Sequence, residues 1–166
     1  MRLIGTFSLT ESKTMQTIIT PFLWFDTQAE EAMNFYASIF KDSEILNASR
    51  NGDSVMSVTF QLGTQKFIAC NFGPAYKFNE AISLMVDCKT QAEVDELWER
   101  LSEGGEPGRC GWLKDKFGMS WQIIPQALGE LLSGPDPEKS KRVMEAMMQM
   151  SKIDVKLLEE ASNREI

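Results

Sequence analysis

The sequence contains no histidine among its 166 residues. This absence excludes a Ser-His-Asp triad, a Cys-His pair and imidazole acid/base catalysis within the chain. It also disfavours zinc and non-haem iron sites, which usually depend on imidazole ligands. Cysteine is scarce too: the chain has only Cys70, Cys88 and Cys110, which are widely spaced and form no CxxC pair. We therefore expect buried, reduced thiols rather than disulfides or a zinc site.

Basic residues are outnumbered by acidic ones, 17 to 24, which gives a formal charge of -7. Such a balance argues against nucleic acid and anionic membranes as partners, because phosphate contacts need clustered Lys and Arg. No apolar run approaches the roughly 18 residues of a membrane span, and residues 1–14 lack the apolar core of a signal peptide. We expect a cytoplasmic protein.

The length and the 43% hydrophobic content fit one domain or two small modules around a shared core. Residues 1–14 are polar and weakly patterned, so we expect a disordered leader or a natural start at Met15. We expect paired modules over residues 15–125, at about 15–72 and 80–125. Residues 126–166 are expected to form a helical extension of the same domain.

Both halves of residues 15–125 predict a β-α-β-β-β order. In the first half, the apolar strand Ile18–Phe25 is expected to hold Pro21 at an edge or at an outward-facing N–H position. Thr27 with Glu30 then forms a capping-box pattern before an amphipathic helix. In the second, a strand precedes a capping-box pattern of Thr90 with Glu93. The remaining predicted strands are Glu44–Leu46, Met56–Leu62, Gln65–Phe72, Ala81–Asp87 and the hairpin Cys110–Pro125. The intervening loop, with Tyr76 and Phe78, is either a lid or a packed connection.

The closing hairpin, CGWLKDKFGMSWQIIP, turns at Asp115–Gly118. Its second strand places Ser120, Gln122 and Ile124 on one face and apolar residues on the other, so both faces are expected to be partly buried. A buried Gln122 needs a partner, which is either a cross-strand hydrogen bond or a ligand.

The tail predicts three helices, with Asp136 and Asp154 as caps. The second carries Val143, Met144, Met147 and Met148 on an apolar face, and methionine-rich faces adapt to irregular surfaces. This tail would cover a dimer partner, shield a pocket, or pack on its own sheet.

Three blocks of the sequence, TPFLWFD, KFNEA and the closing hairpin, resemble the PhnB-like branch of the vicinal oxygen chelate superfamily, whose family label is 3-demethylubiquinone-9 3-methyltransferase. The resemblance covers about Ile18 to Pro125. It implies an α+β fold in which two tandem βαβββ modules form a curved mixed sheet around a cavity, as in glyoxalases and dihydroxybiphenyl dioxygenases. It also implies a homodimer.

Metal-dependent members of this superfamily carry ligands at four positions, which the resemblance places here near Ile19 or Thr20, at Ala69–Asn71, at Ala81 beside Glu80, and at Gln122. Two amides and one carboxylate make a poor site for Zn²⁺ or Fe²⁺. We predict no catalytic metal and no cofactor. The methyltransferase label is not expected to describe the activity, because no Gly-rich run opens a helix as an S-adenosylmethionine site of Rossmann type requires.

Aromatic side chains are the expected place for a small organic ligand, since rings supply large apolar area at small entropic cost. The candidates for ligand binding are Phe22, Trp24, Asn71, Trp112, Trp121 and Gln122; ordinary core packing is the other interpretation for the rings. Glu80 is the only plausible general base if burial raises its pKa, and a solvated or Arg-paired Glu80 is the alternative. We therefore predict a metal-free binding protein, or alternatively a metal-independent lyase or isomerase that uses Glu80.

Overall fold

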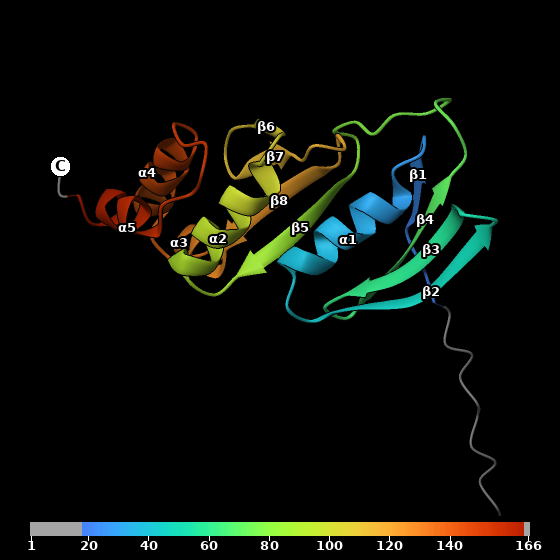
Figure 1. The fold of residues 1–166 in the computed structure, drawn as a ribbon. Helices are drawn as coiled ribbons and strands as arrows, with labels where there is room; N and C mark the ends of the chain where they lie inside the picture. Colours follow the sequence, from blue (N-terminus) through green and yellow to red (C-terminus); the bar gives the residue numbers. More distant parts are fainter. Residues whose placement is uncertain (1–17, 165–166) are drawn as a thin grey trace, which may run out of the picture.

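Two βαβββ modules lie side by side in a computed structural model that describes residues 18–164. The leader, 1–14, and the alternative start at Met15 lie outside these residues. Figure 1 shows the first module at one end, the second in the middle and three further helices at the other end. The predicted α+β fold of two βαβββ modules with a helical tail is confirmed.

The first module is a four-stranded sheet in the order β1-β4-β3-β2, with β1 parallel to β4. Pro21 shortens its first strand, because proline has no N–H to donate to a ladder. β1 therefore starts after Pro21, not at the expected Ile18, and the Pro21 carbonyl accepts a hydrogen bond from the Ile68 amide. The elements are β1 (Phe22–Phe25), α1 (Ala29–Ile39), β2 (Ser43–Asn51), β3 (Ser54–Leu62) and β4 (Gln65–Asn71).

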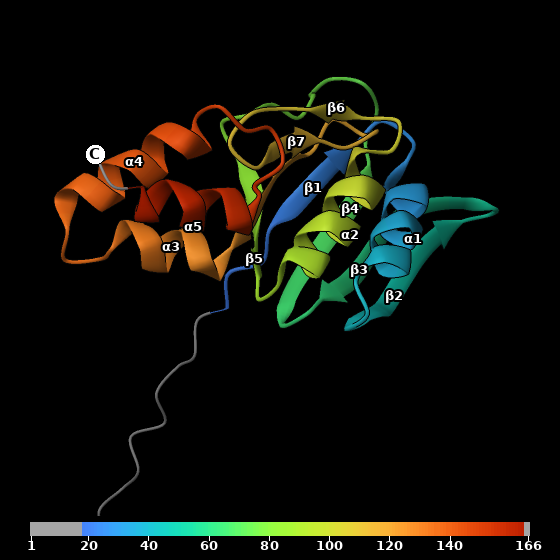
Figure 2. The same ribbon diagram turned by 90° about the vertical axis from the view of Figure 1, so that its left-hand side faces the viewer.

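The second module repeats this topology in the order β5-β8-β7-β6, with β5 parallel to β8. Its edge strand β6 is only two residues long. Figure 2 shows α1 and α2 side by side against the two sheets, and they contact one another. The elements are β5 (Ser83–Cys88), α2 (Gln91–Ser102), β6 (Glu106–Pro107), β7 (Trp112–Lys114) and β8 (Ser120–Pro125).

Only one of the two predicted capping boxes forms. At α2 the Thr90 hydroxyl accepts from the Glu93 amide at 3.2 Å, as expected, and the Glu93 carboxylate accepts in return from the amide of Lys89, one residue before the cap. At α1 the prediction is wrong: the helix follows Gln28, and no side chain of the N-cap residue bonds the first turn. Instead, the Asn71 amide oxygen on β4 accepts from the Ala29 amide at 2.8 Å, so a distant residue caps the helix.

A buried carboxylate joins the modules. Asp115, in the turn between β7 and β8, is only 3% exposed. Its oxygens accept from the Tyr36 hydroxyl of α1 at 2.7 Å and from the Trp121 indole N–H at 2.8 Å. They also accept from the backbone N–H groups of Phe117 and Met119. One continuous apolar core runs around this group through both modules.

The tail packs in cis on the second module. Its helices are α3 (Gln126–Leu132), α4 (Pro137–Met147) and α5 (Val155–Asn163), and Asp136 and Asp154 cap α4 and α5 as predicted. The amides of Cys110 and Gly111 donate to the carbonyls of Met150 and Ser151, both at 2.8 Å. These helices have a core of their own, which consists of Leu128, Val143, Ile153 and Leu158.

The predicted apolar face of α4 is buried only in part. Val143 is fully buried and Met147 packs against the core of the tail, whereas Met144 is 41% exposed and Met148, just after the helix, is 52% exposed. Within residues 18–164, no helix combines the length and the apolar character that crossing a bilayer requires.

Candidate functional site

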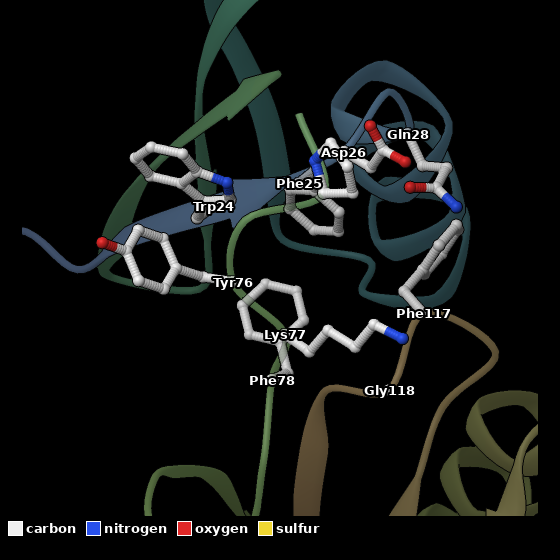
Figure 3. Close-up of a pocket in the computed structure, with 10 residues that line it drawn as sticks. Trp24, Phe25, Asp26, Gln28, Tyr76, Lys77, Phe78, Phe117 and Gly118 are labelled. Atoms are coloured by element: carbon white, nitrogen blue, oxygen red, sulfur yellow. The ribbon is translucent and has the colours of Figure 1, made fainter. Parts of the chain in front are cut away.

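An aromatic pocket of about 290 Å³ lies at the junction of the modules (Figure 3). Four segments surround it: the end of β1, the turn into α1, the loop 74–78 that leads to the second module, and the turn between β7 and β8. A volume near 300 Å³ is at the lower end of the range for small-molecule pockets. The lining residues are Trp24, Phe25, Asp26, Gln28, Pro74, Tyr76, Lys77, Phe78, Phe117 and Gly118.

The rings of this aromatic pocket hold one another in place. The Trp24 indole N–H donates to the Gly73 carbonyl at 2.9 Å, which fixes its ring against the loop. Tyr76 meets the Trp24 ring edge-on, with centroids 5.0 Å apart. Phe78 and Phe117 meet the buried Phe25 ring edge-on at 5.1 and 6.1 Å. Edge-to-face pairs of this kind stabilise defined ring positions, so the walls are preorganised.

Polar groups occupy one side of the aromatic pocket. In Figure 3 the side chains of Asp26 and Gln28 lie above Phe117, and the Lys77 chain runs across the pocket toward it. One carboxylate, one amide and one ammonium are thus available beside apolar walls. This arrangement can orient a ligand that has a flat apolar body and a polar end.

Of the predicted aromatic candidates, only Trp24 lines the aromatic pocket. Phe22 is 52% exposed and stacks on Phe72, with ring centroids 6.1 Å apart. Trp121 is 2% exposed, and its N–H is committed to Asp115. Its ring stacks on Phe40 and borders a separate groove of about 610 Å³ between the modules. Ligand roles for Phe22 and Trp121 stay predictions.

The two predicted amides already have partners within the protein. Asn71 accepts from Ala29 and donates to the Val55 carbonyl at 3.0 Å, so both ends of its side chain are used. Gln122 donates to the Ser83 hydroxyl at 2.8 Å, which is the cross-strand alternative from the sequence. Neither amide lines the aromatic pocket.

Glu80 and Trp112 lie together, but elsewhere. Both line a smaller pocket of about 180 Å³ beside β6 and β7. The Glu80 side chain is 62% exposed and forms an ion pair with Lys114 at 2.5 Å. A hydrogen bond from Lys114 lowers the pKa of Glu80. Of the two readings from the sequence, the structure therefore agrees with a solvated and paired Glu80, although the partner is a lysine and not an arginine. A carboxylate that is exposed and paired holds protons weakly and is a poor general base at neutral pH.

The metal positions that the superfamily implies do not fit a metal here. Gln122 and Asn71 have intramolecular partners, and Glu80 is paired with Lys114. Within residues 18–164, no three His, Cys, Asp or Glu side chains group as metal ligands. The remaining donors are neutral amides, which are weak ligands for transition metals.

Several residues of the aromatic pocket were not among the sequence-based candidates, namely Phe25, Asp26, Gln28, Lys77, Phe117 and Gly118. The sequence predicts Tyr76 and Phe78 only as part of a loop that is either a lid or a packed connection. Their clustering in the short segment FGPAYKFNE was a usable signal. By contrast, Phe117 reaches the pocket only because the modules pack together, which no local pattern reveals.

Comparisons with known proteins place residues 17–124 within the model of the 3-demethylubiquinone-9 3-methyltransferase family. A search of curated proteins found no match. Among solved structures, a Bacillus cereus PhnB protein, described as a candidate methyltransferase of the same name, is 37% identical with a TM-score of 0.60. The alignment covers 66% of this chain and 99% of that one.

Two further solved structures support the fold alone. Protein PA1353 from Pseudomonas aeruginosa is 22% identical, with a TM-score of 0.58, over 66% of this chain and 98% of its own. The fosfomycin resistance protein FosX from Listeria monocytogenes is 18% identical, with a TM-score of 0.55, over 73% of this chain and 100% of its own.

Proposed function

The chain belongs to the 3-demethylubiquinone-9 3-methyltransferase family, the PhnB-like branch of the vicinal oxygen chelate superfamily, and from this premise we propose that it binds a small organic molecule without a catalytic metal. The site is the aromatic pocket between its modules. The observation that carries this proposal is the set of interlocked rings with polar groups on one side. The preferred ligand has a planar apolar body and a hydrogen-bonding end.

The methyl-transfer activity in the family's name has no structural support in this chain. The turns from β1 to α1 and from β5 to α2 contain no glycine. An S-adenosylmethionine site of Rossmann type needs a Gly-rich turn at such a strand-to-helix junction, on a parallel sheet. Both sheets here are mixed, with most neighbouring strands antiparallel. The residues present do not fit that cofactor.

Indole is a suitable probe of the aromatic pocket because it is flat, apolar and has one N–H donor. Calorimetric titration of the wild-type protein should show saturable binding. Tyr76→Ala should weaken it about fivefold, the equivalent of roughly 1 kcal/mol for one lost aromatic contact.

Phe72→Ala is the matched control for this titration. Phe72 also meets the Trp24 ring edge-on at 5.0 Å and is about half exposed, but it does not line the pocket. The affinity of Phe72→Ala for indole should equal that of the wild type. An equal loss in both variants, or no saturable binding by the wild type, would refute the proposed site.

The alternative function, a metal-independent lyase or isomerase that uses Glu80, receives less support. The Lys114 ion pair lowers the pKa of Glu80, and the carboxylate is outside the aromatic pocket. If Glu80 is nevertheless the base, Glu80→Gln abolishes turnover of a bound substrate while its affinity stays within twofold. Unchanged turnover would exclude this alternative.

A homodimer is part of the proposal. Large apolar side chains are exposed on the first strands of both modules and beside them, including Phe22 (52%), Ile82 (57%) and Met85 (64%). A contiguous patch of exposed apolar side chains marks a contact surface, and the proposed dimer requires that these residues form one. Light scattering should give the mass of two chains, and Met85→Glu should give one. The control Met144→Glu, on the exposed side of α4, should remain a dimer.

A further inference from the structure

One buried hydroxyl has no partner in the part of the chain that the structure describes. Ser120 is 1% exposed, and its Oγ forms no hydrogen bond within residues 18–164. A buried hydroxyl without a partner costs free energy, so such groups in folded proteins usually meet water or a ligand. Ser120 lines the smaller pocket of about 180 Å³, which shares no residue with the aromatic pocket.

The strand register places charged side chains beside the Ser120 hydroxyl. Ser120 pairs with Lys114 on β7, and Lys114 pairs with Glu106 on β6. Paired residues point to the same face of a sheet, so the three side chains form a row. Glu80 forms an ion pair with the Lys114 of this row at 2.5 Å. All four residues line the smaller pocket.

The charges of the smaller pocket do not cancel. Two carboxylates, Glu80 and Glu106, face one ammonium, Lys114, which leaves one negative charge in excess. An anionic ligand is therefore disfavoured, and a second cation is favoured. Trp112 forms a wall of the same pocket, and aromatic faces attract ammonium groups.

From these observations we propose that the smaller pocket is a second ligand site, which takes a small primary ammonium ion. The N–H groups of the ligand donate to the Ser120 hydroxyl and to a carboxylate of Glu80 or Glu106. Its alkyl chain lies against Trp112. The Lys114 ammonium competes with the ligand for the same carboxylates. This site is independent of the aromatic pocket, and it gives Glu80 a binding role in place of base catalysis.

Three probes of the same size test the charge preference at pH 7: propylammonium, 1-propanol and propanoate. Binding is followed by the NMR signal of the Trp112 indole N–H, identified with Trp112→Phe. Propylammonium should shift this signal saturably, and propanol should bind at least tenfold more weakly. Propanoate should leave the signal unchanged. Equal responses to the three probes would overturn the proposal.

Two variants with opposite expected effects test the residues. Ser120→Ala should bind propylammonium about tenfold more weakly, because a hydrogen bond to a charged group is lost. Lys114→Met should bind it about tenfold more tightly, because the competing ammonium is gone. The control Ser57→Ala, on β3 of the first module and outside this pocket, should match the wild type.

Stability separates a ligand site from a site for an ordered water. If an ordered water is the hydrogen-bond partner of the Ser120 hydroxyl, Ser120→Ala lowers the melting temperature, and propylammonium changes the melting temperature of neither the wild type nor the variant. This result would refute the proposal. If the Ser120 hydroxyl has no partner until an ammonium ion binds, Ser120→Ala without ligand melts at or above the melting temperature of the wild type. It also loses the thermal protection that propylammonium gives the wild type. Weaker binding of propylammonium by Lys114→Met would refute the claim that Lys114 competes with the ligand for the carboxylates.

Discussion

Asp115→Asn is the change that most directly tests how the modules are held together. The substitution keeps the shape of the side chain but replaces one carboxylate oxygen by an NH₂ group. In the folded protein Oδ2 accepts from both Tyr36 and Trp121. The Tyr36 hydroxyl can rotate and accept from the new amide. The Trp121 indole is only a donor and cannot, so a buried N–H would lose its partner.

The expected cost follows from this unpaired donor. Leaving one buried N–H without a partner costs about 1–3 kcal/mol, and losing the charge weakens the other hydrogen bonds. Removing a buried charge returns part of this cost, since burial is the main cause of the raised pKa of Asp115. We therefore expect Asp115→Asn to lower the free energy of unfolding by about 2 kcal/mol.

The assay is urea unfolding followed by circular dichroism, with the midpoint and the slope compared between variants. Glu31→Gln is a matched control, because Glu31 joins α1 to the same turn through an ion pair with Lys116 at 2.7 Å, but on the surface. Exposed pairs contribute little, so this control should lose less than about 0.5 kcal/mol. Equal stability of the two variants would refute the role of Asp115 as the buried link.

The pH dependence has a definite sign. Because the folded pKa of Asp115 is raised, the folded state takes up the proton before the unfolded chain does. The contribution of Asp115 to stability therefore increases as the pH falls from this raised pKa toward the usual value of 3.8, and decreases as the pH rises. Asp115→Asn should remove this component. A pH profile of the same shape in both proteins would contradict the assignment.

Three further predictions concern single residues. Gly111→Ala should release the C-terminal helices to proteolysis, since a Cβ would lie 2.9 Å from the Ile123 carbonyl; Gly118→Ala, with a similar positive φ but open space, should leave them protected. Thr90→Ala should cost about 1 kcal/mol in urea unfolding, and Thr27→Ala close to nothing, because only Thr90 caps its helix. Burial raises the pKa of Cys88 to about 11, so at pH 8 it should react with iodoacetamide far more slowly than free cysteine.

Local sequence patterns predicted the fold in most of its parts. The two-residue period of β3 and the helical period of α2 arise from one buried face, which a sequence displays directly. The caps Thr90, Asp136 and Asp154 depend only on residues three or fewer positions away. The predicted cap at Thr27 is wrong because Asn71, which is distant in the sequence, accepts the hydrogen bond from the first turn of α1 instead. A local motif cannot show that a neighbouring strand supplies the cap.

The candidate sites were harder to predict, because side chains have to be assigned to a pocket, a core or a pair. Trp24 and Trp121 look alike in the sequence, but Trp24 lines the aromatic pocket while Trp121 donates to the buried Asp115. Glu80 is flanked by Asn79 and Ala81, which gave no sign of the ion pair with Lys114. These outcomes depend on side-chain contacts between segments that are separated in the sequence, and no single segment shows those contacts.

Native mass spectrometry of the wild-type protein, Tyr76→Ala and Phe72→Ala, purified side by side, tests the central claim most directly. We predict that the wild type and Phe72→Ala retain an organic molecule as extra non-covalent mass, without a bound metal ion, and that a smaller fraction of Tyr76→Ala carries this mass. The same spectra should show a dimer. Extra mass that is equal in all three proteins, or one metal ion per chain, would contradict a metal-free binding site in the aromatic pocket.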